Sequence, residues 1–196
     1  MSSDTELLSA WRDGDRDAGD ELLRRYFDAV CRFFRGKLGD DVEDLIQRTF
    51  LDCVESRDRV REDGFRAYLF TVARNRLFDH LRAAQRRPER VDISLRSVED
   101  LGTSPSTKLA RTEHERLLIR ALRSIPLDYQ IALELAYWEQ LSGREIAVVL
   151  GIAENTVRSR MSRAREALRA KLEQLAASPE LSDSTLQSFD ARSRLD

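Results

Sequence analysis

The chain has 196 residues, of which 41% are hydrophobic and 35% are charged. This length suffices for one large or two small domains, and only 8 Gly and 4 Pro disfavour a β protein with many turns. No apolar run approaches the roughly 18 residues that a membrane helix needs, and the acidic N-terminus lacks a signal-peptide pattern. We therefore expect a helical, cytoplasmic protein without membrane insertion.

Cysteine and histidine are too few and too scattered to suggest a metal centre. Cys31 and Cys53 each lie among apolar residues at helical spacing, which is typical of buried thiols. His80 and His114 are isolated, and neither C-x-x-C nor H-x-x-x-H spacing occurs. We expect no structural metal and no cofactor.

The net charge of −2 hides an uneven distribution. Residues 155–171 carry six basic side chains and one acidic side chain, a local charge of 6 − 1 = +5, so the remainder carries −2 − 5 = −7. A basic patch on an acidic body can bind an anionic polymer selectively, while the body limits nonspecific adsorption.

The N-terminal part, residues 5–87, has apolar positions three and four residues apart, which predicts helices. Gly39 is suited to end one helix, and Asp40 or Asp41 to cap the next. A third long helix is predicted over residues 65–87. The positions predicted to face inward on this third helix are Leu69, Val72, Ala73, Leu77 and Leu81.

Two later segments interrupt the helical pattern. Residues 88–111 contain two prolines, a glycine and a Ser/Thr cluster, and are predicted to be an interdomain linker, part of which could form a short turn. Helical periodicity resumes over residues 112–177. Residues 178–196 are rich in Ser and Asp and are interpreted as a disordered C-terminal tail, with a regulatory segment as the alternative. The predicted domains are therefore 1–87 and 112–177.

The stretch "GREIAVVLGIAENTVRSRM" has the spacing of a helix-turn-helix. Ser142 can cap its first helix, with Glu145 at the reciprocal capping-box position. Gly151 can adopt the left-handed conformation at the turn, and Asn155 or Thr156 is expected to start the second helix. A plain helical hairpin is the alternative, but a hairpin does not require a capping box, a turn glycine and a second helix start at these spacings.

The second helix divides into an apolar stripe and a polar face. Val157, Met161, Ala164 and Leu168 lie within roughly 60° of one another and form the predicted core side. A solvated helix with i,i+4 ion pairs is the alternative, but it needs interleaved acids, and only Glu166 is available. The residues predicted to contact duplex DNA are Asn155, Thr156, Arg158, Ser159, Arg160, Ser162, Arg163 and Arg165.

These residues divide into two predicted roles. Arg158, Ser159, Ser162 and Arg163 point away from the stripe and are placed to reach base edges in a major groove. Arg160 and Arg165 project from the flanks and are placed to reach phosphates.

Longer stretches carry a family resemblance. "DDVEDLIQRTFLDCVE", followed by "FRAYLFTVARNRLFDHLRAAQRR", resembles the two central motifs of domain two in sigma factors of bacterial RNA polymerase. "LRSIPLDYQIALELAYWEQLSGREIAVVLGIAENTVRSRMSRAREALRAKL" resembles sigma domain four. Over about residues 5–177 the chain is similar to an extracytoplasmic-function (ECF) sigma factor. The resemblance implies an all-α fold, with a sigma domain two helical bundle and a sigma domain four helix-turn-helix joined by a flexible linker.

The resemblance assigns a polymerase-binding face to the helix over residues 42–54. In the family this face docks on the clamp coiled coil of the largest polymerase subunit, and here it carries Asp41, Asp44, Gln47 and Arg48. Asp44 and Gln47 match the family pattern "EDLxQ". Arg48 departs from the pattern, because a glutamate is usual there.

By the same resemblance, the helix from Phe65 engages the −10 element after its bases unstack. Basic groups would hold the phosphates of the separated strand, and a pocket would accept a flipped base. Tyr68 stands where ECF members commonly have Trp, and is interpreted as a core residue rather than a stacking platform. The residues predicted to contact the −10 element are Arg66, Arg74, Asn75, Asp79, Arg82 and Arg86.

The function that the resemblance implies is that of a promoter-specificity subunit. It would bind core RNA polymerase through the clamp coiled coil and the flap of the second-largest subunit, read the −35 and −10 elements, assist melting and direct transcription of a stress- or signal-responsive regulon. Many family members are held by an anti-sigma factor, so such a partner is a family expectation.

Two other classes of protein fit the sequence less well. A helix-turn-helix regulator resembling response regulators needs a sensing or phosphoacceptor domain, but residues 1–87 lack an alternating β/α pattern. An enzyme is disfavoured because no phosphate loop, nucleophile motif or convergent His/carboxylate set appears.

Overall fold

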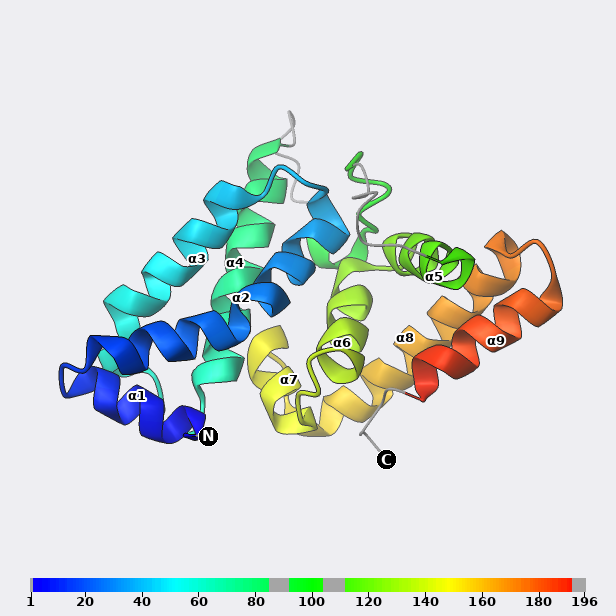
Figure 1. Cartoon of the computed structure of the whole chain (residues 1–196). Helices are drawn as coiled ribbons and strands as arrows, with labels where there is room; N and C mark the ends of the chain where they lie inside the picture. Colours follow the sequence, from blue (N-terminus) through cyan, green and yellow to red (C-terminus); the bar gives the residue numbers. More distant parts are fainter. Residues whose placement is uncertain (1, 85–91, 104–111, 192–196) are drawn as a thin grey trace.

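The computed structural model describes residues 2–84, 92–103 and 112–191, and every regular element within these ranges is helical (Figure 1). The all-α prediction is therefore confirmed for the part of the chain described. The α-helices are α1 (Asp4–Arg12), α2 (Arg16–Leu38), α3 (Glu43–Ser56), α4 (Phe65–Ala84), α5 (Glu113–Arg123), α6 (Leu127–Tyr137), α7 (Gly143–Leu150), α8 (Glu154–Leu175) and α9 (Pro179–Asp190). The 3-10 turns are η1 (Arg57–Arg59) and η2 (Ile93–Leu95).

The helices form two units that lie side by side (Figure 1). We call α1–α4 the N-terminal unit and α5–α9 the C-terminal unit. The units meet in the middle of the molecule, where α4 packs against α7 and α2 contacts α5. None of the described helices is both long and apolar enough to cross a membrane.

The start of α3 follows from burial rather than from a side-chain cap. Gly39 ends α2 with a φ of 90°, as predicted. The residue before α3 is Val42, which provides no side-chain cap, so the prediction that Asp40 or Asp41 holds this position is wrong. Val42 is instead buried in the core, and its amide donates to the carboxylate of Glu43.

The predicted interior of the N-terminal unit is confirmed. The five inward positions of α4, from Leu69 to Leu81, are all buried. Cys31 and Cys53 are buried free thiols, as their apolar neighbours indicated. Burial raises the pKa of Cys53 to about 12 and also raises the pKa of Cys31.

The first residues of the predicted tail are helical, so the expectation of a disordered tail is wrong for residues 178–191. Ser178 caps α9 by accepting from the Leu181 amide, and Pro179 occupies the first turn. Phe189 is buried and stacks on Tyr137 with ring centroids 4.1 Å apart. One buried aromatic side chain thus anchors a segment whose polar composition suggested disorder.

The described part of the predicted linker, residues 92–103, packs against both units. Its short turn is η2, where Ile93 is buried. The Thr103 hydroxyl donates to the Lys37 carbonyl of α2 at 2.7 Å, and the Leu127 amide of α6 donates to the Arg96 carbonyl at 2.8 Å. Residues 92–103 are therefore bound to both units by hydrogen bonds.

Substitution of Phe189 tests whether α9 belongs to the folded core. We expect Phe189→Ala to lower the free energy of unfolding by about 3–5 kcal/mol, because it leaves a cavity against Tyr137. The measurement is urea unfolding followed by circular dichroism. Phe27→Ala is the matched control, because Phe27 also stacks on a ring, that of Phe50, but is 50% exposed. Equal losses in the two variants would contradict the anchoring role of Phe189.

Candidate nucleic-acid interface

The helix-turn-helix is formed by α7 and α8, and its local signals are those that the sequence indicated. The Glu145 amide donates to the Ser142 hydroxyl at 3.3 Å, and the Glu145 carboxylate accepts from the Ser142 amide at 2.8 Å. Gly151 ends α7 in the left-handed region with a φ of 65°. The second helix begins at Glu154 after Ala153, slightly earlier than predicted, and its first turn has no side-chain cap.

The polar face of α8 matches the predicted wheel. Val157, Met161, Ala164 and Leu168 are buried. The opposite side of α8 is exposed and carries most of the residues that are predicted to contact duplex DNA. These exposed residues are Asn155, Thr156, Arg158, Ser159, Ser162 and Arg163. The geometry therefore brings six of the eight predicted residues together on one face.

The two flanking arginines of α8 are bound within the protein. An Nη of Arg160 donates to the Asp128 carboxylate at 2.9 Å. The Nε of Arg165 donates to the Tyr137 hydroxyl, and the guanidinium lies 3.8 Å from the carboxylate of Asp190 on α9. Each of these two arginines therefore has an acceptor within the protein, although the Arg165 side chain is also 44% exposed.

The predicted −10 residues on α4 also fall into two groups. Asn75, Asp79 and Arg82 are exposed. Arg66 and Arg74 are half-buried and bound to acids of the C-terminal unit: Arg66 donates two hydrogen bonds to Glu145 at 2.7 and 3.0 Å, and Arg74 donates to Asp128 at 2.8 Å. Arg86 lies outside the described residues.

A shallow cavity of about 360 Å³ opens between α3 and α4. Its lining includes Tyr68, Asn75 and Asp79, so it joins an aromatic ring to two of the predicted −10 residues. Asp52 and Arg76 line it as well and form a pair of hydrogen bonds at 2.6 and 2.7 Å. Neither residue was predicted from the sequence, although Arg76 directly follows Asn75 on α4.

The predicted polymerase-binding residues lie on the outer side of the N-terminal unit. Asp41, Asp44, Gln47 and Arg48 are all exposed, while Leu45 and Ile46 between them are buried. The Nε of Arg48 donates to the Asp44 carboxylate at 3.0 Å, one turn away. Arg48 thus partly neutralises the acid that matches the family pattern.

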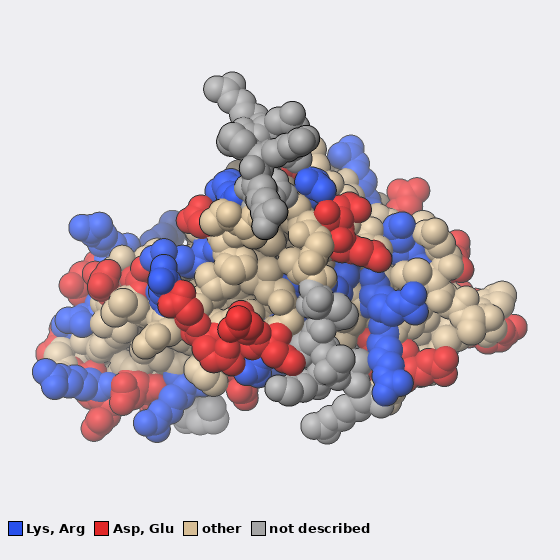
Figure 2. Space-filling view, turned by 90° about the horizontal axis from the view of Figure 1, so that it is seen from above, with Lys and Arg blue, Asp and Glu red and all other residues tan. Residues whose placement is uncertain are grey.

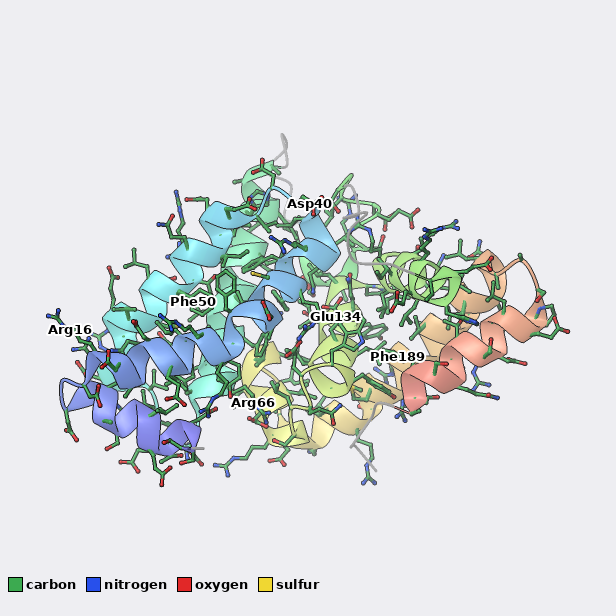
Figure 3. The ribbon with its side chains drawn as sticks, in the orientation of Figure 1. Arg16, Asp40, Phe50, Arg66, Glu134 and Phe189 are labelled. Carbon is green, nitrogen blue, oxygen red and sulfur yellow. The ribbon has the colours of Figure 1, made fainter. Side chains whose placement is uncertain are left out.

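Ion pairs join the two units, and none of them was predicted from the sequence. In the part of the chain described, each of these pairs has its base in the N-terminal unit and its acid in the C-terminal unit. Figure 3 labels one base, Arg66, and one acid, Glu134, of two different pairs. The pairs are Arg32–Glu139, Lys37–Glu134, Arg66–Glu145 and Arg74–Asp128. The acids and bases are far apart along the chain, so spacing alone could not join them.

The Lys37–Glu134 pair is fully buried at the centre of this interface. The Lys37 ammonium donates to the Glu134 carboxylate and to the Phe33 carbonyl, and lies 3.9 Å from the centre of the Phe33 ring. Gln130 donates to the second oxygen of Glu134 at 2.8 Å. Burial lowers the pKa of Lys37, and the charge of Glu134 opposes this shift. One sequence signal indicated that Lys37 is buried, because Lys37 falls on the apolar stripe of Val30, Phe33 and Phe34.

Hydrogen bonding also shifts the titration of the Arg66–Glu145 pair. Burial would raise the pKa of Glu145, but hydrogen bonds from Arg66 and Ser142 outweigh burial and hold the pKa below its ordinary value. For Arg66, burial lowers the pKa, and the hydrogen bond and charge of Glu145 more than restore it. Both groups are therefore held in their charged forms.

Neutralising one member of the buried pair should be more harmful than removing both. We expect Lys37→Met to lower the free energy of unfolding by about 3–5 kcal/mol, because it leaves Glu134 buried without its cation. Lys37→Met combined with Glu134→Met should recover most of this loss, since two thioether side chains can fill the space. Urea unfolding of both variants is the measurement. A double variant no more stable than the single one would contradict this account.

Comparisons with known proteins agree with this geometry. The family described as Sigma-70 region 2 matches residues 22–87, which include most of α2 and all of α3 and α4. The family described as Sigma-70, region 4 matches residues 115–168, which include α7 and most of α8. The ECF RNA polymerase sigma-E factor of Haemophilus influenzae is 30% identical over 183 residues, covering 88% of this chain and 97% of the relative. The protein of the same name from Escherichia coli (strain K12) is also 30% identical, with 88% and 96% covered.

Solved structures share the fold. CnrH in complex with the cytosolic domain of CnrY aligns with a TM-score of 0.65 at 24% identity, covering 89% of this chain and all of that one (100%). The sigma factor RpoE in complex with the anti-sigma factor NepR from Bartonella quintana aligns with a TM-score of 0.61 at 23% identity, covering 79% and 96%. The two-unit helical architecture is thus that of known sigma factors.

Proposed function

This chain belongs to the extracytoplasmic-function (ECF) sigma factors of RNA polymerase, and we propose that it reads the two promoter elements with two separate helices. The observation that carries this division is the exposed polar face of α8, opposite a fully buried stripe. A helix with this organisation at the second position of a helix-turn-helix fits a major groove. We assign α8 to the −35 element and α4 to the −10 element.

At the −35 element, Arg158, Ser159, Ser162 and Arg163 contact base edges. Each is exposed on the N-terminal half of α8, the part of a recognition helix that enters the groove. Asn155 and Thr156 lie at the helix start, where backbone amides and short polar side chains bind phosphate. Arg160 and Arg165 act as flanking phosphate contacts once they leave their present acidic partners.

At the −10 element, the cavity between α3 and α4 receives an unstacked base. Tyr68, which the sequence suggested as a core residue, is half-buried against the core but also lines this cavity, so it offers a ring face to the base. The Asn75 amide and the Asp79 carboxylate offer hydrogen bonds to base edges. Arg66, Arg74, Arg82 and Arg86 follow the phosphates of the same strand. Unstacking costs a few kcal/mol per base, so holding even one base favours the melted state.

The exposed face formed by Asp41, just before α3, and by Asp44, Gln47 and Arg48 of α3 binds the clamp coiled coil of the polymerase, and the C-terminal unit binds the flap. The protein then acts in the cytoplasm with the polymerase, which supplies the chemistry. We also propose an anti-sigma factor as a partner, because the similar RpoE structure contains one. The domains assigned to these roles are residues 1–87 and 112–177, connected by 88–111.

Run-off transcription tests the proposed function directly. Core polymerase with this protein should produce discrete transcripts from a promoter library, and core polymerase alone should not. Asp44→Arg should abolish these transcripts, since it reverses the charge of the polymerase-binding face. DNA binding without any promoter-dependent transcript would instead favour a helix-turn-helix regulator.

Base readout by α8 is tested at Arg163, on a promoter obtained from that library. Arg163→Ala should weaken binding to the matching −35 element by about 1–3 kcal/mol and relax the base preference at one position. Arg163→Lys keeps the positive charge but cannot donate two parallel hydrogen bonds to one base as a guanidinium does. It should therefore also lose the base preference at that position. The measurement is a salt titration of holoenzyme binding to matched and mismatched promoters.

Arg169→Ala provides the control for charge alone. Arg169 is exposed on the same helix but outside the proposed contact set, so its loss should affect matched and mismatched promoters equally. Retained specificity in Arg163→Lys would show that Arg163 contacts only phosphate.

A further inference from the structure

We infer that Arg12 of α1 is a positioning residue for the −10 element, because it holds the loop between α3 and α4 in a single shape. Residues 57–64, which include η1, are called the α3–α4 loop. The inference rests on the proposed function, in which the cavity between α3 and α4 receives an unstacked base. It adds a residue that does not line this cavity and that acts through the backbone of the loop.

The α3–α4 loop sets how the two walls of the cavity stand relative to each other. Ser56, the last residue of α3, and Tyr68, near the start of α4, both line the cavity. The loop is the stretch of chain that joins them, and its Gly64 carbonyl accepts from the Tyr68 amide at 2.9 Å. A change in the shape of the loop is therefore expected to move one lining residue relative to the other.

The loop has few contacts of its own that fix its shape. Two hydrogen bonds close turns within it, from the Val60 amide to the Arg57 carbonyl at 3.3 Å and from the Gly64 amide to the Arg61 carbonyl at 3.0 Å. Val60 is buried, but most of the other side chains are exposed. The exposed side chains are those of Asp58, Arg59, Arg61, Glu62 and Asp63. A loop of this kind opens at little cost in free energy unless partners outside it hold it.

Arg12 provides such a partner at two points. Its Nε donates to the Arg57 carbonyl at 3.0 Å, and an Nη donates to the Val60 carbonyl. These carbonyls lie at the two ends of η1, so one planar guanidinium group holds this turn from both ends. The neighbouring Trp11 adds a contact, since its ring centre lies 5.7 Å from the Arg57 guanidinium. Because Trp11 is itself buried, α1 is a fixed support for these contacts.

The acceptors of Arg12 distinguish it from an arginine that only joins helices. Within the ranges that the structure describes, Arg12 forms no ion pair, and its acceptors are backbone carbonyls of the α3–α4 loop. Arg25 of α2, in contrast, pairs with Asp4 of α1 at 2.6 Å and with Glu21 at 3.1 Å. The contacts of Arg12 therefore depend on the shape of one loop and not on the charge of a neighbouring side chain.

The charges of the loop make its shape more important than its net charge. The loop has three basic and three acidic side chains, so its net charge is zero. On the face of the molecule seen in Figure 2, basic and acidic side chains of the described residues are interspersed as well. A neutral loop gains little from long-range attraction to phosphates. Contact with the separated strand then depends on where the exposed guanidinium groups of Arg59 and Arg61 stand.

Proteolysis of the loop tests whether Arg12 anchors it. Arg12→Met removes both hydrogen bonds and keeps an unbranched side chain. We expect trypsin to cleave after Arg59 and Arg61 about tenfold faster in this variant, because hydrogen bonds from a charged donor no longer oppose opening of the loop. The measurement is the initial rate of these two cleavages in the full-length chain, followed by mass spectrometry.

Promoter binding tests whether the anchor matters for the −10 element. The holoenzyme is titrated onto a promoter obtained from the run-off library, with the −10 region already unpaired so that the cost of melting is absent. Arg12→Met should lower the ratio of affinities for matched and mismatched −10 elements by about tenfold, because the binding-competent shape of the loop is less populated. The same ratio for the −35 element should not change, since α8 lies in the other unit.

Arg25→Met is the matched control. It removes the same charge and loosens the attachment of α1 to α2, but Arg25 has no contact with the α3–α4 loop. We expect this variant to match the wild-type chain in the cleavage rates and in both affinity ratios. An equal effect of Arg25→Met would overturn the inference, because attachment of α1 and not the fork of Arg12 would then be responsible.

The remaining outcomes separate the inference from the proposed function. Unchanged cleavage in Arg12→Met, or faster cleavage with an unchanged −10 ratio, would overturn the inference and leave the sigma role intact. Equal losses at the −35 and −10 elements would also overturn it, because they indicate a general loss of structure. Absence of any promoter-dependent transcript with the wild-type chain would overturn the proposed function and the −10 role of Arg12 with it, whereas the cleavage rates would still report the anchor.

Discussion

The buried pair of Lys37 and Glu134 is the constraint on which the arrangement of the two units depends. An ammonium group removed from water must meet a full set of acceptors, and here these come from the Phe33 carbonyl and from a carboxylate of the other unit. This requirement ties α2 to α6 through one ion pair, in the same interface in which α4 packs against α7. The positions of Arg66 and Arg74 opposite their acids follow from the same placement.

The two surfaces assigned to DNA consequently differ in how available they are. The base-reading side chains of α8 are exposed, while four arginines assigned to phosphates, two on each helix, are bound to acids or to a phenol. The side chains assigned to base edges and these four arginines assigned to phosphates therefore differ in their surroundings in this structure. Phosphate contacts supply much of the affinity for DNA and base contacts supply the selectivity, so the internal partners of Arg66, Arg74 and Arg160 bear on affinity more than on selectivity.

Features formed by residues close together along the chain could be predicted from the sequence, and features formed by residues far apart along the chain could not. The capping box of Ser142 and Glu145, the turn at Gly151 and the buried stripe of α8 are all local, so spacing revealed them. Helix α9 was missed because its stability comes from Phe189 packing on Tyr137, a residue 52 positions earlier (189 − 137). The ion pairs between units were missed for the same reason, since a lone Lys37 or Asp128 in a sequence does not indicate its partner.

Arg123 of α5 donates to the carbonyls of Gly36 and Lys37, at 2.9 Å each, and so satisfies the last turn of α2 from the other unit. If the units separate, water must replace Arg123 at these carbonyls and must also surround the Lys37 ammonium and the Glu134 carboxylate. Separation of the two units would therefore hydrate these buried polar groups as well as move the helices apart. Its equilibrium would respond to the activity of water, and excluded solutes that favour buried surface would favour the arrangement in which the two units stay in contact.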